Sequence, residues 1–236
     1  MIRVEPAPEP DRFDLECRRR GRAWLASAAG RSWRRMGKPS MPAYWTAFEP
    51  ELYAAFEGRC GYAAMYIPPP AQVDHYQDKA ASPDLAYEWD NYRVAAPYLN
   101  AKKSGRTVLD PFEITGDWFE VLWPSLQLAV TAAVPRAKRQ LAENTIRDLG
   151  LRDSEWIIRW RQSLVDAFLD RQATLDELRL RAPLLAAMVE RHRISPGRPR
   201  AAEDRAVRSS RERSRRGPAR RAGGPRRSSA RSGRRP

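Results

Sequence analysis

The sequence predicts an α+β protein, mainly helical, that carries one small module of short strands and ends in a disordered tail. Apolar residues recur at helical spacing on both sides of residues 59–110, whereas inside that range they form short runs broken by prolines and Gly105. Hydrophobic residues make up 42% of the 236 residues and include 8 Trp, which is enough for a folded core. After Ile194, Val207 is the only larger aliphatic residue.

These changes in composition divide the chain into four segments. They are an N-terminal helical segment (1–58), the strand-containing module (59–110), a mostly helical C-terminal segment (111–194) and the tail (195–236). The tail holds 15 arginines and three acidic residues, so it carries most of the net charge of +14, and the rest of the chain is nearly neutral. Net charge alone therefore does not assign the folded part to nucleic-acid binding.

Two helices are expected in the first segment. The composition of Phe13–Ala29 favours a helix, and aromatic and aliphatic residues recur every three or four positions over Tyr44–Phe56. A basic loop, Gly30–Ser40, is expected between them. Pro50 is expected to kink or split the second helix, and Gly58 to end it.

The C-terminal segment predicts one strand followed by helices. Residues 117–123 alternate as a strand does, and helices are expected over 137–149, after Asp153 or Ser154, from Thr174 and from Pro183. Large apolar residues share one face of the helix after Ser154. This stripe predicts core packing for four residues: Trp156, Trp160, Leu164 and Phe168.

The tail is predicted to be disordered, because its Arg, Ser, Gly, Pro and Ala residues cannot bury enough apolar surface to fold. Two explanations of this composition stay open. Such a tail binds phosphates nonspecifically through counterion release, and a misread frame in GC-rich DNA would give a similar composition.

Cysteine usage and hydropathy indicate the compartment. Cys17 and Cys60 are the only cysteines, too few for a disulfide framework or a four-thiolate zinc site. The chain contains no apolar run of about 18 residues and no signal-like segment. A cytoplasmic protein without membrane contact is therefore expected.

The residues suited to chemistry lie within 59–110. If one short strand ends at His75, a second covers 91–95 and Pro97 opens a helix, then Asn100 would face Asp74 across a small gap. Carboxylate and amide oxygens are ligands that Mg²⁺ prefers, and phosphodiester hydrolysis needs such a cation and a base that deprotonates water. Side chains alternate along a strand, so His75 would point away from Asp74 unless the strand twists or ends there.

These residues resemble the HNH endonuclease motif. In that ββα-metal module an Asp-His pair ends the first strand, an Asn follows, and a His or Asn lies on the closing helix. Here His75 and Asn91 are 16 positions apart and Asn91 and Asn100 nine. The nine-residue step is similar to the Asn-ending variant found in the HNH domain of RNA-guided CRISPR nucleases. The resemblance covers about residues 59–110, under a quarter of the chain.

The resemblance implies a role for each residue. His75 would be the general base that activates water, and Asp74 and Asn100 would hold a single Mg²⁺ or Mn²⁺. Asn91 would fix the loop through backbone hydrogen bonds, so that His75 faces the phosphate. Two further residues would contact phosphates: Lys102 and Lys103.

The sequence departs from the family at the zinc ligands. Many members bind a structural zinc through two C-x-x-C pairs, whereas the corresponding positions here read Cys60-Gly61-Tyr62-Ala63 and Ala96-Pro97-Tyr98-Leu99. Structural zinc is therefore not expected. A small apolar core is expected in its place: Tyr62, Tyr66, Trp89, Tyr98 and Leu99.

The leading hypothesis is a metal-dependent endonuclease that acts on DNA, with RNA as the alternative substrate. Small proteins with a lone HNH module resemble components of phage-defence or mobile-element systems, some of which work with a separate ATPase. One alternative is a non-catalytic protein that keeps the HNH shell and binds nucleic acid through its tail, or serves as a partner subunit of a defence system. Another is a structural helical protein in which the motif is accidental.

Overall fold

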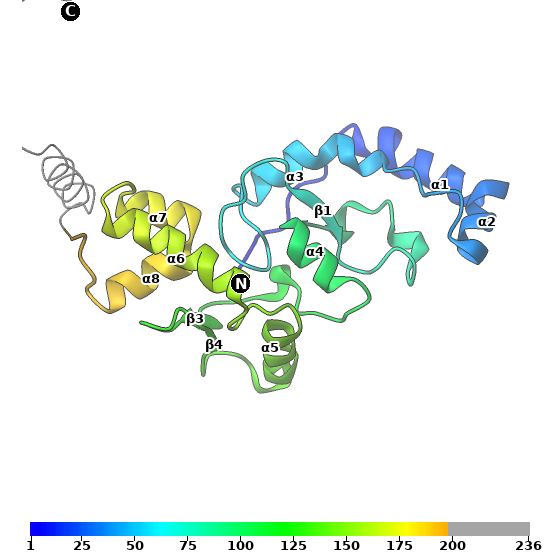
Figure 1. The fold of residues 1–236 in the computed structure, drawn as a ribbon. Coiled ribbons are helices and arrows are strands. Elements are labelled where there is room, and N and C mark those ends of the chain that lie inside the picture. Colours follow the sequence, from blue (N-terminus) through cyan, green and yellow to red (C-terminus); the bar gives the residue numbers. More distant parts are fainter. Residues whose placement is uncertain (198–236) are drawn as a thin grey trace, which may run out of the picture. The chain divides into compact units, whose positions relative to one another are not determined.

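The computed structural model describes residues 1–197 and has the α+β fold that the sequence predicts (Figure 1). Helices make up most of the regular structure, together with two small antiparallel sheets. The disorder predicted for 195–236 falls, apart from residues 195–197, outside the described residues. Within 1–197, no helix is both long enough and apolar enough to cross a lipid bilayer.

The N-terminal segment contains one more helix than the sequence predicted. A helical turn, Asp14–Arg18, continues into α1 (Arg19–Ala26), and α2 (Ala28–Met36) follows after one residue. The prediction of a loop over Gly30–Ser40 was therefore wrong up to Met36. Ser27 begins the new helix, because its side chain accepts a hydrogen bond from the Gly30 amide at 3.2 Å.

The second predicted helix is split, as Pro50 led us to expect. A 3₁₀ turn, Tyr44–Phe48, precedes α3 (Glu49–Ala55), and Pro50 lies in the first turn of α3, where its missing N–H removes no helical hydrogen bond. Gly58 follows with φ +69°, a left-handed conformation that favours glycine.

The module has the predicted order of strand, strand and helix. β1 (Gln72–His75) pairs antiparallel with β2 (Tyr92–Ala95), and His75 lies opposite Tyr92 in this pairing. α4 (Pro97–Lys103) begins directly after β2 and contacts β1. Pro97 occupies the first turn of α4, where a proline is well suited to open a helix.

The C-terminal segment begins with a second hairpin, β3 (Phe119–Val121) and β4 (Leu128–Val130). The four predicted helices follow it: α5 (Arg136–Asp148), α6 (Glu155–Leu169), α7 (Leu175–Arg181) and α8 (Pro183–Arg191). Thr174 and Glu177 form a capping box at the start of α7.

The predicted core stripe on α6 is buried at its C-terminal end only. Phe168 is buried, but Trp156 is 38% exposed. The first turn of α6 lies beside α4, so the Trp156 ring packs 4.7 Å from the ring of Tyr98 instead of entering the core. The prediction of core packing was therefore wrong for Trp156.

Aromatic contacts join the N-terminal segment to the module. The ring of Phe13 lies 5.3 Å from Trp89 and 5.8 Å from Tyr92. At Gly21, in α1, a Cβ atom would lie 2.1 Å from Cγ of Tyr87, so only glycine allows the helix to approach that ring so closely. The N-terminal helices and the strands of the module thus share one packed interior.

Candidate active site

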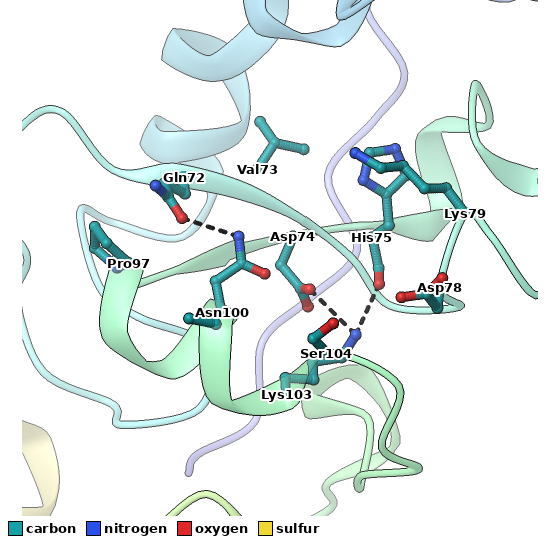
Figure 2. Close-up of a pocket in the computed structure, with 11 residues that line it drawn as sticks. Gln72, Val73, Asp74, His75, Asp78, Lys79, Pro97, Asn100, Lys103 and Ser104 are labelled. Atoms are coloured by element: carbon teal, nitrogen blue, oxygen red, sulfur yellow. Dashed lines mark hydrogen bonds and ion pairs between the residues drawn. The ribbon is translucent and has the colours of Figure 1, made fainter. Parts of the chain in front are cut away.

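A cleft of about 360 Å³ opens between β1 and α4 (Figure 2). Asp74 and His75 line it from the end of β1, and Asn100 and Lys103 line it from α4. Four of the six residues that the sequence analysis singled out therefore share one cleft. Two strands and a helix bring them together from positions up to 29 residues apart.

The carboxylate of Asp74 is buried and already holds a cation. Its Oδ2 accepts a hydrogen bond from the Tyr62 hydroxyl at 2.5 Å, and its Oδ1 lies 3.1 Å from Nζ of Lys103. Burial raises the pKa of Asp74, and the Lys103 ammonium and the Tyr62 hydroxyl oppose that rise. The cleft thus contains a carboxylate that one internal cation balances.

Lys103 does not occupy the position expected of a phosphate contact. Its side chain is buried, and Nζ donates to Asp74 and to the backbone carbonyl oxygens of His75 at 2.7 Å and Tyr76 at 2.9 Å. α4 packs on β1, so the residue one turn after Asn100 points at the end of that strand. The ammonium therefore lies in the wall of the cleft, where it serves a buried carboxylate.

Lys102 lies on a different face of α4. Its Nζ is 5.0 Å from the centre of the Tyr98 ring, and the residue is half-buried. It does not line the cleft. Its role as a phosphate contact stays a prediction.

His75 points away from the Asp74 carboxylate, as strand alternation requires (Figure 2). Its Nε2 lies 2.9 Å from the carbonyl oxygen of Ala86, which only accepts hydrogen bonds, so Nε2 carries the proton. The neutral ring therefore has its lone pair on Nδ1. Nδ1 accepts no hydrogen bond from residues 1–197 and is the basic atom of this imidazole.

The imidazole of His75 is fixed by aromatic neighbours. The ring meets Trp45 at 4.5 Å and Tyr92 at 5.2 Å, both edge-on, and the Tyr92 hydroxyl donates to the same Ala86 carbonyl. Burial, with a smaller contribution from the nearby Lys79 ammonium, lowers the pKa of His75 to about 4. The imidazole is therefore neutral at pH 7.

The lowered pKa of His75 predicts a pH-dependent stability. The unfolded imidazole binds a proton near pH 6.5 and the folded one only near pH 4, so the unfolded chain holds more protons between these values. The free energy of unfolding should therefore fall by up to about 3 kcal/mol as the pH drops from 6.5 to 4. Urea unfolding of wild type and His75→Gln in EDTA isolates this contribution. If the free energy of unfolding varies with pH in parallel for the two proteins, His75 is not the source of the pH dependence.

Asn91 lies behind the cleft and fastens the loop that joins β1 to β2. Its Oδ1 accepts from the Gln77 amide at 2.7 Å, and its Nδ2 donates to the carbonyls of Gln77 and Leu85, both at 3.0 Å. These are backbone hydrogen bonds of the kind that the HNH resemblance implied. They hold the loop that carries Ala86, and therefore the carbonyl that orients His75.

Asn100 and Asp74 are the residues that would hold a divalent cation in this cleft. Nδ2 of Asn100 donates to Oε1 of Gln72 at 3.0 Å, which leaves its Oδ1 without a hydrogen bond from the described chain. That oxygen and the Asp74 carboxylate line the same cleft from two elements (Figure 2). Both are hard oxygen donors of the kind that Mg²⁺ and Mn²⁺ prefer. Both oxygens of Asp74 already have partners, Oδ1 in the Lys103 ammonium and Oδ2 in the Tyr62 hydroxyl.

The positions that correspond to zinc ligands lie together around Cys60. Its buried Sγ accepts hydrogen bonds from the amides of Ala63 at 3.5 Å and Ala96 at 3.4 Å. Of the residues expected to form an apolar core here, Tyr62, Trp89 and Leu99 are buried. Tyr98 is 38% exposed, because it turns outward to Trp156, so that part of the prediction was wrong.

Several residues of the site were missed or misjudged by the sequence analysis. Gln72 orients Asn100, and two-residue alternation from Asp74 could have placed it on the same face of β1. Asp78, Lys79 and Ser104 complete the wall, but they come from turns without a periodic pattern. Trp45 packs on the His75 ring, but it lies 30 positions earlier in the chain, and no sequence pattern around it indicates this contact.

Comparison with known proteins finds no family model and no curated protein that matches this chain.

Proposed function

We propose that this chain is a metal-dependent endonuclease of the HNH type that hydrolyses phosphodiester bonds in DNA. The observation that carries the proposal is the composition of one cleft. Its lining includes His75, whose neutral imidazole is held on the other side of β1, and two hard oxygen ligands, Asp74 and Asn100, from neighbouring elements (Figure 2). General-base catalysis and a divalent cation are the two requirements of this hydrolysis.

His75 would act as the general base. Nδ1 takes the proton of the attacking water, and Nε2 continues to donate to the Ala86 carbonyl, which stabilises the imidazolium that forms. Trp45 and Tyr92 keep the ring from rotating. Asn91 would act indirectly, because it holds the loop whose Ala86 carbonyl orients His75.

Asp74 and Asn100 would hold Mg²⁺ or Mn²⁺. When bound, the cation neutralises charge that builds up on the phosphate and on the leaving oxygen. The Lys103 ammonium competes with it for Oδ1 of Asp74.

The proposal predicts metal-dependent cleavage of supercoiled plasmid by the purified chain. We expect nicked or linear product in Mg²⁺ or Mn²⁺ and none in EDTA. Asp74→Asn and Asn100→Ala should each lower the rate by about 10²-fold or more, as loss of a cation that supplies several kcal/mol requires. Gln127→Ala, at an exposed position outside the cleft, is the matched control. Cleavage that persists in EDTA, or equal rates in all variants, would contradict the proposal.

A second candidate function is supported by the same Lys103. A buried ammonium that permanently satisfies Asp74 would leave a nucleic-acid-binding protein with an HNH-like shell and no catalysis. This candidate predicts DNA binding without cleavage under every metal condition, and no change in binding on His75→Ala.

The proposal extends to the cellular system in which the protein works and to its substrate. We expect a cytoplasmic component of a phage-defence or mobile-element system, in which a partner such as a separate ATPase contributes target choice. RNA is the alternative substrate, and parallel digestion of labelled DNA and RNA of the same sequence distinguishes the two.

A further inference from the structure

The first two helices carry a concentrated positive charge. Between Glu16 and Glu49 the chain has no acidic residue and eight basic ones, although residues 1–194 as a whole are nearly neutral. All eight lie on α1 and α2 or within two residues of their ends: Arg18, Arg19, Arg20, Arg22, Arg31, Arg34, Arg35 and Lys38. We call this set the basic helix pair.

Half of these charges are balanced by acidic neighbours. Arg18 and Arg22 pair with Glu88, Arg19 with Asp14, and Arg34 with Asp84. Within residues 1–197, no acidic side chain lies within 4.0 Å of the other four, which are all exposed: Arg20, Arg31, Arg35 and Lys38.

Three of these exposed residues form a row. Arg31, Arg35 and Lys38 are spaced four and three positions apart, so Arg31 and Arg35 share one face of α2 and Lys38 follows just beyond its end. The four helical steps from Arg31 to Arg35 rise about 6 Å, close to the spacing between successive phosphates of a nucleic-acid strand, and Lys38 extends the row beyond the helix. A row of this length can contact more than one phosphate.

Aromatic contacts connect the basic helix pair to the cleft. His75 packs on Trp45, and the Trp45 ring lies 5.6 Å from that of Tyr87. Tyr87 lies 5.9 Å from Tyr44, and the guanidinium of Arg20 lies 4.3 Å above Tyr44. The helices are therefore anchored to the same packed group that orients the proposed base.

The composition of this surface favours nucleic acid over a lipid membrane. A helix that binds a membrane surface needs exposed apolar residues opposite its charges. On α1 and α2 the exposed large apolar residue is Met36, whereas Trp24 and Trp33 are half-buried and pack together with ring centres 6.2 Å apart. Exposed arginines and a lysine that outnumber the one exposed large apolar residue of these helices are suited to backbone phosphates.

We propose that the basic helix pair binds backbone phosphates of the same nucleic acid on which the cleft acts. This inference rests on the proposed function for the identity of its partner. The affinity of the folded chain for nucleic acid then comes mainly from α1 and α2, with Arg31, Arg35 and Lys38 as the principal contacts.

Fluorescence anisotropy with a labelled duplex of about 25 base pairs tests this proposal on the full chain over a range of salt concentrations. The variant is Arg31→Ala/Arg35→Ala/Lys38→Ala. The matched control, Arg136→Ala/Arg147→Ala/Arg159→Ala, removes the same charge from exposed positions on α5 and α6. Both keep the tail, so its contribution cancels.

We expect the helix-pair variant to bind at least tenfold more weakly at low salt. The slope of log affinity against log salt should fall by about 2 to 3, because each lost contact to B-DNA contributes about 0.9. The control should bind like wild type. Equal losses of DNA affinity in both variants would overturn the proposal. So would a helix-pair variant that binds DNA normally but binds vesicles containing phosphatidylserine more weakly than wild type does.

Cleavage measurements keep this inference separate from the proposed function. If the chain cleaves DNA but the helix-pair variant binds normally, the inference fails and the nuclease stands. If no condition gives cleavage but the variant loses binding, the nuclease fails and the phosphate-binding surface stands. Circular dichroism of all three proteins confirms that they are folded.

Discussion

Replacing His75 with alanine is expected to abolish measurable DNA cleavage, with a loss in rate of about 10² to 10⁴-fold, the usual contribution of a general base. Nδ1 is the unprotonated nitrogen of the neutral imidazole, and alanine supplies no acceptor in its place. Initial rates of plasmid nicking in Mg²⁺, at equal DNA occupancy, measure the effect.

The chain offers a matched control for this substitution. His192, the other histidine, lies exposed at the end of α8, so His192→Ala should cleave at the wild-type rate. His75→Gln keeps part of the side-chain volume and should also be inactive. DNA binding by His75→Ala should be within about twofold of wild type, because the change in the base removes no charge. Equal nicking rates for His75→Ala and His192→Ala would show that His75 is not the base.

Replacing Lys103 with methionine is expected to destabilise the folded protein by about 3–5 kcal/mol in EDTA. The substitution removes the cation that balances a buried carboxylate, and the Tyr62 hydroxyl remains as the one partner of Asp74. The carbonyls of His75 and Tyr76 lose their donor as well. Urea unfolding measures the loss, and Lys103→Met/Asp74→Asn should recover part of it because the double variant has no unpaired charge.

The same variant tests the competition for Asp74. Without the ammonium, Mg²⁺ should bind Asp74 and Asn100 more tightly, so millimolar Mg²⁺ should raise the melting temperature of Lys103→Met more than that of wild type. Lys103→Met/Asp74→Asn should not respond. A melting temperature of Lys103→Met that is insensitive to Mg²⁺ would indicate that Asp74 serves the lysine alone.

The order of elements in the module was predictable because its signals are local. Pro97 marks the start of α4, and the apolar run before it gives β2. A strand that ends at His75 and a helix that begins at Pro97 then put Asp74 and Asn100 on neighbouring elements. Alternation along β1 also anticipated that His75 and Asp74 point in opposite directions.

The partners of these residues were not predictable in the same way. Trp45 reaches His75, and Tyr62 reaches Asp74, through contacts between segments that are 30 and 12 positions apart. Neither segment has a pattern that specifies such a contact. Lys103 was expected to face a phosphate because it follows Asn100, but burial and three oxygen acceptors at the end of β1 direct its ammonium inward.

The helical segments show where composition misleads. Gly30 and the arginines around it favoured a loop, but Ser27 caps a new helix that continues to Met36. Trp156 fits a core stripe by spacing, yet its position in the first turn of α6 brings it to the exposed Tyr98. The first error missed a local N-cap, and the second arises from tertiary packing that overrides a pattern in the sequence.

Mn²⁺ binding to the cleft tests the proposed site most directly. Electron paramagnetic resonance of free Mn²⁺, titrated into His75→Ala with a short duplex, counts bound ions while the substrate stays intact. We expect His75→Ala to bind one more Mn²⁺ per chain than His75→Ala/Asp74→Asn, because Asp74 supplies the charged ligand. Identical titrations of the two proteins would mean that Asp74 holds no catalytic cation, and that this cleft is not the centre of a metal-dependent nuclease.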